Sequence, residues 1–193
     1  FHINAWCIPY SALVAGAKLV LPGPKLDGAS LYELLEAEQV TMTAGVPTIW
    51  MGLIQHVEQN GLRFNHLQRT LVGGTAMPQA LIARFVDDYG VEVRHGWGMT
   101  ETTAVATLSV LSRQDMARPA AERHAIIARQ GKPVPGIEIQ VVDESGHTLP
   151  RDDKSQGELM VRGHWIMERY YKADRSALVD GWFPTGDIAT ISA

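Results

Sequence analysis

Short apolar runs alternate with longer amphipathic segments along the first half of this chain. The runs have the length and β-branched content of strands, and they lie at residues 17–22, 41–46, 69–74 and 91–97. The segments between them have helical spacing of apolar side chains, at residues 29–39, 47–60 and 77–90. This alternation predicts a mostly parallel sheet with helices on its faces.

Capping residues predict where these helices begin. Ser30 and Glu33 have the spacing of a capping box at the first helix. Pro47 and Pro78 fit the first turns of the next two, because proline is tolerated there.

The pattern changes after about residue 107. Residues 116–129 are polar and predict a helix on a long connection, whereas residues 137–143 and 157–163 predict short antiparallel strands. Residues 182–191 predict two more short strands around a Thr-Gly-Asp turn. The expected fold is α/β: a parallel-sheet subdomain with flanking helices at 1–110, a connection at 111–129, and a small, partial antiparallel β-barrel at 130–193.

The composition argues against nucleic-acid binding, a transmembrane segment and an internal disulfide. Seventeen basic against 21 acidic side chains give a net charge of -4, so no overall basic surface is expected for nucleic acid. The apolar stretch at 5–22 is interrupted by proline, serine, glycine and lysine, which predicts no transmembrane segment. The single cysteine, Cys7, rules out an internal disulfide and fits a reducing, cytoplasmic location.

Four segments combine glycine with small hydroxylic or acidic residues. They are VGGTAMP (72–78), HGWGMTETT (95–103), GELMVRG (157–163) and GWFPTGD (181–187). The first two fall at the carboxyl ends of predicted strands, where α/β sheets bind ligands. Gly73 and Gly74 would let the backbone approach a planar ligand; the alternative is a plain strand-to-helix turn capped by Thr75.

The other candidate side chains suit a nucleotide. Trp97 offers a face for stacking, Thr100 a hydroxyl donor, and Glu101 an oxygen ligand for magnesium. Asp187 could accept both hydroxyls of a ribose. The alternatives are a buried core tryptophan beside a polar loop, and an aspartate that only shapes a turn.

Several familiar motifs are missing. The chain has no GxxxxGK[ST] loop, no GxGxxG, no HExxH and no GxSxG. A P-loop NTPase, a Rossmann dinucleotide enzyme, a zinc protease and a Ser-His-Asp hydrolase are therefore not supported.

The glycine-rich segments in this order resemble the ATP-dependent adenylate-forming (AMP-binding) enzymes. Residues 1–50 are most similar to the medium- and long-chain fatty acyl-CoA synthetases of that family. The resemblance implies a ligase of fatty acid metabolism that uses ATP, Mg²⁺ and coenzyme A. Such enzymes convert a carboxylic acid and ATP to acyl-AMP and pyrophosphate, and then transfer the acyl group to CoA.

The resemblance also implies roles for individual residues. Thr100 would act catalytically on the α-phosphate and Glu101 would bind the magnesium ion. The adenine and ribose would be held by Gly73, Gly74, Thr75, His95, Gly96, Trp97 and Asp187, with Trp97 where many relatives have tyrosine. The carboxylate pocket and acyl channel would be lined by His2, Trp6, Val46 and Pro47.

The chain begins at Phe1 in an apolar segment and ends at Ala193 after a strand-like run. We therefore expect an internal fragment of the large N-terminal domain of such an enzyme. The family's phosphate-binding loop and catalytic lysine would lie outside it, so the isolated fragment is expected to be inactive. An incomplete barrel would expose sheet edges, which makes self-association an expectation.

Two other functions fit the same residues. One is an enzyme that adenylates an aryl or short-chain acid, because side-chain size in the acyl pocket is not readable from the sequence. The other is a non-catalytic nucleotide-binding or scaffold module that keeps the fold without the chemistry.

Overall fold

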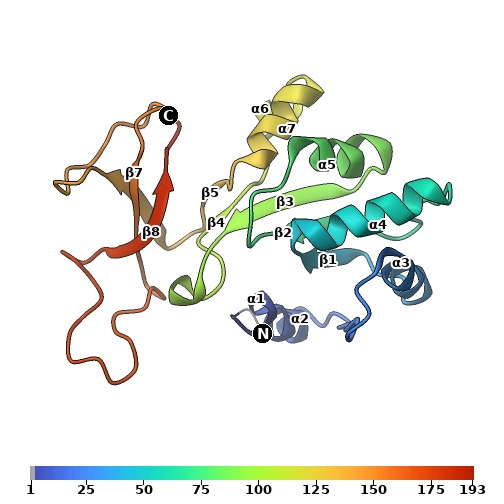
Figure 1. The fold of residues 1–193 in the computed structure, drawn as a ribbon, viewed down its shortest axis with the longest axis horizontal. Helices are drawn as coiled ribbons and strands as arrows, with labels where there is room; N and C mark the ends of the chain where they lie inside the picture. Colours follow the sequence, from blue (N-terminus) through green and yellow to red (C-terminus); the bar gives the residue numbers. More distant parts are fainter. Residues whose placement is uncertain (1–2) are drawn as a thin grey trace. The chain divides into compact units, whose positions relative to one another are not determined.

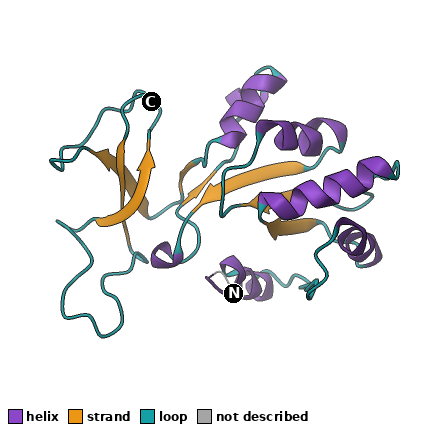
Figure 2. Ribbon diagram, viewed as in Figure 1, coloured by secondary structure: helices purple, strands orange, loops and turns teal. Residues whose placement is uncertain are grey.

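The computed structural model describes residues 3–193, which form two compact units (Figure 1). The first unit comprises the chain up to Gly98 together with Thr107–Lys132, and the second comprises Met99–Ala106 with Pro133–Ala193. Figure 2 shows most of the helices in the first unit, whereas the second is built of strands, long loops and one short helical turn. The segment Met99–Ala106 thus belongs with residues far away along the chain.

The sheet of the first unit has the strand order β1-β2-β3-β4-β5. Its first three strands, β1 (Met42–Gly45), β2 (Arg69–Val72) and β3 (Glu92–Trp97), run parallel, with Thr43 opposite Thr70 and Thr70 opposite Val93. A short β4 (Thr107–Leu108) pairs antiparallel with the end of β3, and β5 (Lys132–Pro133) lies where the chain passes to the second unit. The predicted parallel sheet is confirmed.

Helices pack on this sheet through a shared apolar core. They are α3 (Gly28–Ala37), α4 (Pro47–Gln59), α5 (Gln79–Ala83), the π-helical turn η1 (Arg84–Asp88) and α7 (Ala120–Ala128). The short α6 (Arg113–Met116) has no buried residue. Figure 1 shows α4 and α5 lying over β2 and β3. Leu53 of α4, Ile82 of α5 and Phe85 of η1 are fully buried in this core. Burial of such side chains is the main source of stability, at about 1.5–3 kcal/mol each.

Two helix starts differ from prediction. The N-cap of α3 is Asp27, whose carboxylate accepts the Ser30 N–H at 2.9 Å, so the expected cap at Ser30 was wrong. The helix expected at 116–129 is divided, because Pro119 precedes α7. Pro47, by contrast, opens α4 as predicted.

The strand expected at residues 17–22 is absent. These residues follow α1 (Ile3–Trp6) and α2 (Ile8–Val14) in irregular backbone, and Leu21 is 72% exposed. A run of strand-forming residues becomes a strand only where a neighbour supplies the other half of the hydrogen-bond ladder. Among residues 3–193, β1 pairs only with β2, so this run has no such neighbour.

The second unit is a three-stranded antiparallel sheet. It consists of β6 (Ile137–Val142), β7 (Gly157–Gly163) and β8 (Phe183–Ala189) in that order. Its buried side chains include Val141, Leu159, Val161 and Phe183. Together with the first unit, this sheet confirms the predicted fold class.

The Thr-Gly-Asp sequence does not join two strands as expected, because it lies inside β8. The register between β7 and β8 shifts at Glu158 and Met160, and Gly186 on the opposite strand has φ +76°. A glycine in the left-handed region is typical of a β-bulge, which re-aims the side chains beside it. The motif therefore marks an irregularity within a strand.

The longest described helix, α4, has 13 residues. Within residues 3–193, no helix is both long enough and apolar enough to cross a membrane.

Candidate functional site

The carboxyl ends of β1, β2 and β3 bring several of the predicted site residues together within the first unit. A Cβ atom built on Gly73 would lie 3.4 Å from the Gly96 carbonyl oxygen and 3.6 Å from the Trp6 ring. One built on Gly74 would lie 3.2 Å from Cγ1 of Val46. The residues predicted for the adenine and those predicted for the acyl channel therefore lie side by side at this edge of the sheet.

The turn after β2 depends on glycine. Gly74 has φ +83° and is exposed, a conformation that other residues rarely adopt. Thr75 does not cap a helix, because α5 begins at Gln79 with Pro78 in the N-cap position. The simple strand-to-helix turn capped by Thr75 is thus contradicted, and Gly74 and Thr75 are exposed residues.

His95 lies in the interior of the first unit, with a fully buried side chain. Its Nδ1 is 3.1 Å from the carbonyl oxygen of Ala128, and its Nε2 is 3.2 Å from that of Thr75. A neutral imidazole has one N–H group, so it can donate to only one of these carbonyls at a time. The ring connects the turn after β2 with the end of α7. Trp97, two residues further along β3, is half-buried and lies opposite Thr107.

In the second unit, the residues after β3 form the 3₁₀ turn η2 (Thr100–Thr102). Thr102 is fully buried; its Oγ1 accepts the Met99 N–H at 2.9 Å and donates to the Met99 carbonyl oxygen at 3.0 Å. Thr100 is exposed and Glu101 half-buried. The buried threonine anchors the turn, while the two side chains predicted for phosphate and metal remain accessible.

The loop after β7 holds η2 and its C-cap residue, Thr103, through three hydrogen bonds. Thr103 Oγ1 donates to the Trp165 carbonyl oxygen at 3.0 Å, and the Met167 N–H donates to the Glu101 carbonyl oxygen at 2.9 Å. The Tyr170 hydroxyl donates to Oε1 of Glu101 at 2.8 Å. This hydrogen bond, with burial and the carboxylate charge as smaller causes, raises the pKa of Tyr170.

Sequence reasoning missed Tyr170. It lies 69 residues after Glu101, in a loop of no regular pattern, and the two meet only through tertiary structure.

Asp187 lies on β8 beside the bulge and is exposed. Its N–H donates to Thr185 Oγ1 at 3.1 Å, and that hydroxyl in turn donates to the Leu159 carbonyl oxygen at 2.7 Å. The backbone that carries the carboxylate is thereby fixed to β7.

A dedicated metal cage is not present in the described part of the chain, because residues 3–193 contain no group of three or more His, Cys, Asp and Glu suited to hold an ion. Magnesium, however, commonly takes one or two carboxylates and completes its shell with phosphate oxygens and water. Glu101 has one oxygen engaged by Tyr170 and is accessible, which fits an ion that arrives with a nucleotide. His2, predicted for the carboxylate pocket, lies outside the described residues.

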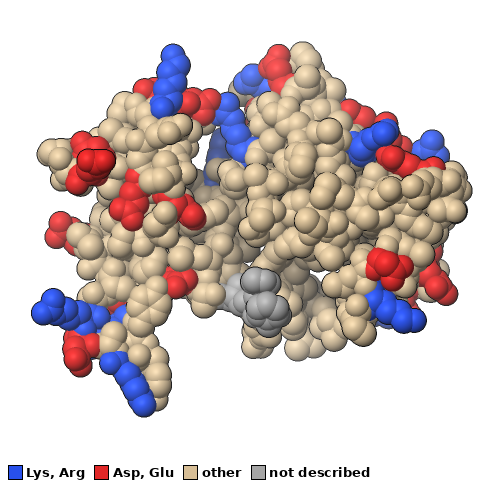
Figure 3. Space-filling view, in the orientation of Figure 1, with Lys and Arg blue, Asp and Glu red and all other residues tan. Residues whose placement is uncertain are grey.

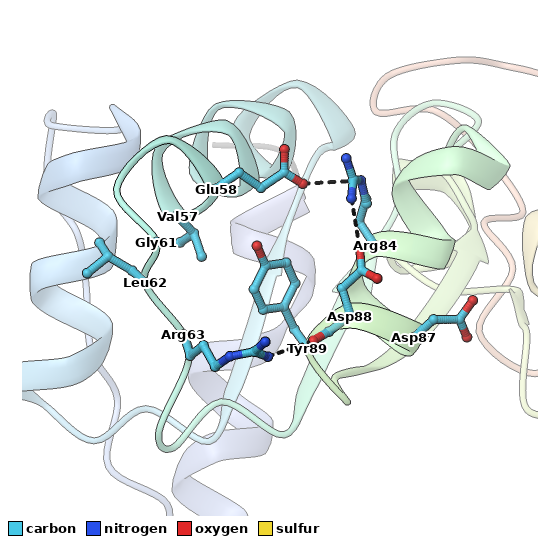
Figure 4. A pocket seen from close by; sticks show the side chains of 9 residues that line it. All are labelled: Val57, Glu58, Gly61, Leu62, Arg63, Arg84, Asp87, Asp88 and Tyr89. Carbon is cyan, nitrogen blue, oxygen red and sulfur yellow. Dashed lines mark hydrogen bonds and ion pairs between the residues drawn. The ribbon is translucent and has the colours of Figure 1, made fainter.

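A separate surface depression of about 550 Å³ lies in the first unit between the end of α4 and η1 (Figure 4). Its charged groups all have partners: Arg84 binds Glu58 at 3.1 Å and Asp88 at 2.9 Å, and Arg63 donates to the Asp88 carbonyl oxygen at 3.0 Å. Asp87 pairs with His124, outside the depression, at 3.2 Å. None of the predicted site residues lines it. On the face seen in Figure 3, acidic and basic side chains are interspersed over the first unit.

Comparison with known proteins places these motifs in context. The family model described as AMP-binding enzyme matches residues 1–171. Over 193 residues the chain is 48% identical to the long-chain-fatty-acid–CoA ligase of Thermus thermophilus, covering 98% of this chain and 36% of that protein. It is 44% identical over 192 residues to the 3-methylmercaptopropionyl-CoA ligase of Ruegeria lacuscaerulensis, covering 99% of this chain and 36% of that protein. The chain thus spans about a third of the length of these relatives.

Among solved structures, the inhibitor-bound N-terminal domain of FACL13 from Mycobacterium tuberculosis has the same fold. It superposes with a TM-score of 0.79 at 23% identity, over 97% of this chain and 44% of that one.

Proposed function

The chain belongs to the AMP-binding enzyme family, and we propose that it forms the nucleotide-binding part of an acid–CoA ligase that acts on fatty acids. The observation that carries this proposal is the gathering of Trp6, Val46, Gly73 and Gly74 at one edge of the first sheet. An enzyme that joins an acid to AMP needs the acid and the nucleotide next to each other. The names of the related ligases support the choice of substrates.

The proposed reaction has two steps. A carboxylate oxygen of the acid attacks the α-phosphorus of ATP, forming acyl-AMP and releasing pyrophosphate. The sulfur of coenzyme A then attacks the acyl carbon, and AMP leaves. The first step adds negative charge at a phosphate that is already charged, so donors and a cation near it are what the transition state requires.

In the first unit, the turn formed by the buried Gly73 and the exposed Gly74 and Thr75 would form one wall of the adenine site and Trp97 the other. Gly96 would lie along the edge of the base. His95 would act on that edge through Thr75, whose carbonyl oxygen it contacts at 3.2 Å. Stacking of a base on an aromatic ring is worth about 1–3 kcal/mol, enough to orient the nucleotide.

In the second unit, the exposed Thr100 hydroxyl would donate to an oxygen of the α-phosphate. Glu101 would hold Mg²⁺, which when bound neutralises phosphate charge and orients the phosphate oxygens. Asp187 would accept hydrogen bonds from the two ribose hydroxyls, because a carboxylate has two acceptor oxygens. ATP, Mg²⁺ and CoA are therefore the proposed cofactor and co-substrates.

The acid would enter past Trp6, Val46 and Pro47, with His2 near its carboxylate. A second candidate is a short-chain acid, favoured by the 44% identity to the 3-methylmercaptopropionyl-CoA ligase. Assays of the whole protein that contains this chain, with straight-chain acids of graded length, would separate the two. Highest kcat/KM at medium or long chains supports the fatty acid, whereas a maximum at three or four carbons supports the alternative.

The nucleotide part of the proposal can be tested on this chain by calorimetric titration with AMP. We expect weak but measurable binding, and at least about a tenfold loss of affinity in Asp187→Ala, because two hydrogen bonds to a charged group are removed. With 2′,3′-dideoxy-AMP, which lacks both hydroxyls, the wild type and the variant should bind equally. Equal affinity for AMP itself would show that Asp187 only shapes its strand.

A further inference from the structure

We propose that Tyr170 is a positioning residue for the magnesium ion: its hydroxyl holds one oxygen of Glu101 so that the other faces the cation. This inference rests on the proposed function, in which Glu101 is the magnesium ligand.

The contact between the two side chains is direct. The Tyr170 hydroxyl lies 2.8 Å from Oε1 of Glu101, a normal distance for an O–H group donating to a carboxylate. Within residues 3–193, the Glu101 carboxylate makes no other hydrogen bond or ion pair, so Oε2 is left for a ligand. The Tyr170 residue is 52% exposed, which means that packing alone does not set the direction of its ring.

The surrounding contacts hold Glu101 and Tyr170 in this geometry. In the same loop, the Met167 N–H donates to the Glu101 carbonyl oxygen, and the Trp165 carbonyl oxygen accepts a hydrogen bond from Thr103. Both the backbone and the side chain of Glu101 are therefore held by one short segment, residues 165–170. A carboxylate on an exposed turn would otherwise have to lose the freedom of its rotatable bonds when it binds a cation.

A tyrosine suits this role better than a charged donor. Arginine or lysine at this position would neutralise the carboxylate and oppose the binding of a second positive charge. The phenol donates a hydrogen bond without adding charge, and it has a single O–H group, so it engages one oxygen only.

The experiment is a calorimetric titration of this chain with ATP, at millimolar concentrations, with and without Mg²⁺. The quantity of interest is the magnesium enhancement, defined as the ratio of the two dissociation constants. In Tyr170→Phe we expect the enhancement to fall about fivefold while the magnesium-free dissociation constant and the thermal unfolding midpoint stay unchanged. Tyr171→Phe is the matched control, because Tyr171 is the adjacent tyrosine and is 89% exposed; it should keep the wild-type enhancement.

Glu101→Gln separates the inference from the function on which it rests. If this variant loses the enhancement but Tyr170→Phe keeps it, the positioning role is wrong and the proposed function stands. If Glu101→Gln keeps it, or if the wild type shows none, both proposals are wrong. An equal loss of ATP affinity in Tyr170→Phe with and without magnesium would assign Tyr170 a purely structural role and overturn the inference.

Discussion

Replacing Thr102 by valine would test whether a single buried hydroxyl holds the turn that presents Thr100 and Glu101. The side chain of Thr102 is fully buried, and its Oγ1 makes two hydrogen bonds to Met99, at 2.9 and 3.0 Å. Valine has nearly the same shape but no hydroxyl, so both bonds are lost and the Met99 N–H loses its partner. At about 1 kcal/mol for each bond, the free energy of unfolding should fall by about 2 kcal/mol.

Serine at the same position is the matched control. Thr102→Ser keeps the hydroxyl and removes one buried methyl group, which should cost about 0.8 kcal/mol. Urea unfolding followed by tryptophan fluorescence would measure both variants, since Trp165 and Trp182 lie in the same unit as the turn. The expected order of stability is threonine, then serine, then valine. A valine variant as stable as the wild type, or more stable than the serine variant, would refute this account of the turn.

Two further predictions concern the first unit. Burial raises the pKa of Glu92, but hydrogen bonds from Arg94 and Arg69 lower it by more, so the net pKa shift is downward. A lowered pKa stabilises the folded state at pH values above the unfolded pKa of about 4.3, and this stabilisation is lost as the pH falls through the folded value. Glu92→Gln should therefore lower the unfolding free energy at pH 7, by less than about 1 kcal/mol for these partly exposed groups, and should match the wild type in acid; a constant difference across pH 3 to 7 would contradict this. Gly74→Ala should cost about 1–2 kcal/mol because of its left-handed backbone, with a further cost from the contact at 3.2 Å with Val46. Thermal unfolding would measure this cost, and Gly74→Asn should lose less because asparagine adopts this conformation more readily; equal losses would argue against backbone strain.

The elements with strong local signals could be predicted from the sequence. Pro47 at the start of α4 and the apolar spacing along it determine that helix almost alone, and the β-branched runs at β2 and β3 lie in a sheet where each has a neighbour. The run at 17–22 has an equally good local pattern, but among the described residues it has no strand beside it. Pairing is a property of two segments, and no single segment encodes it.

The residues of the candidate site also differ in how far local sequence predicts them. Gly73 and Gly74 could be identified from the sequence because a glycine pair directly after a strand is typical of a backbone that turns sharply or lies close to a ligand. His95 was expected beside a ligand, and its burial between two carbonyl groups depends on α7, a helix that begins 25 residues further along the chain. Tyr170 gave no signal at all, because its contact with Glu101 arises only when a distant loop folds back.

The chain passes between the two units three times, because Met99–Ala106 is set between strands of the first sheet and yet belongs to the second unit. Neither unit is one continuous stretch of the gene. Truncation after Lys132 would keep the codons for Thr100 and Glu101 but discard those for Trp165, Met167 and Tyr170, which hold them. A recombination crossover between Ala106 and Pro133 would take the two pieces of the second unit from different parents and so pair the turn with a loop from another protein. The two pieces are therefore expected to be inherited together.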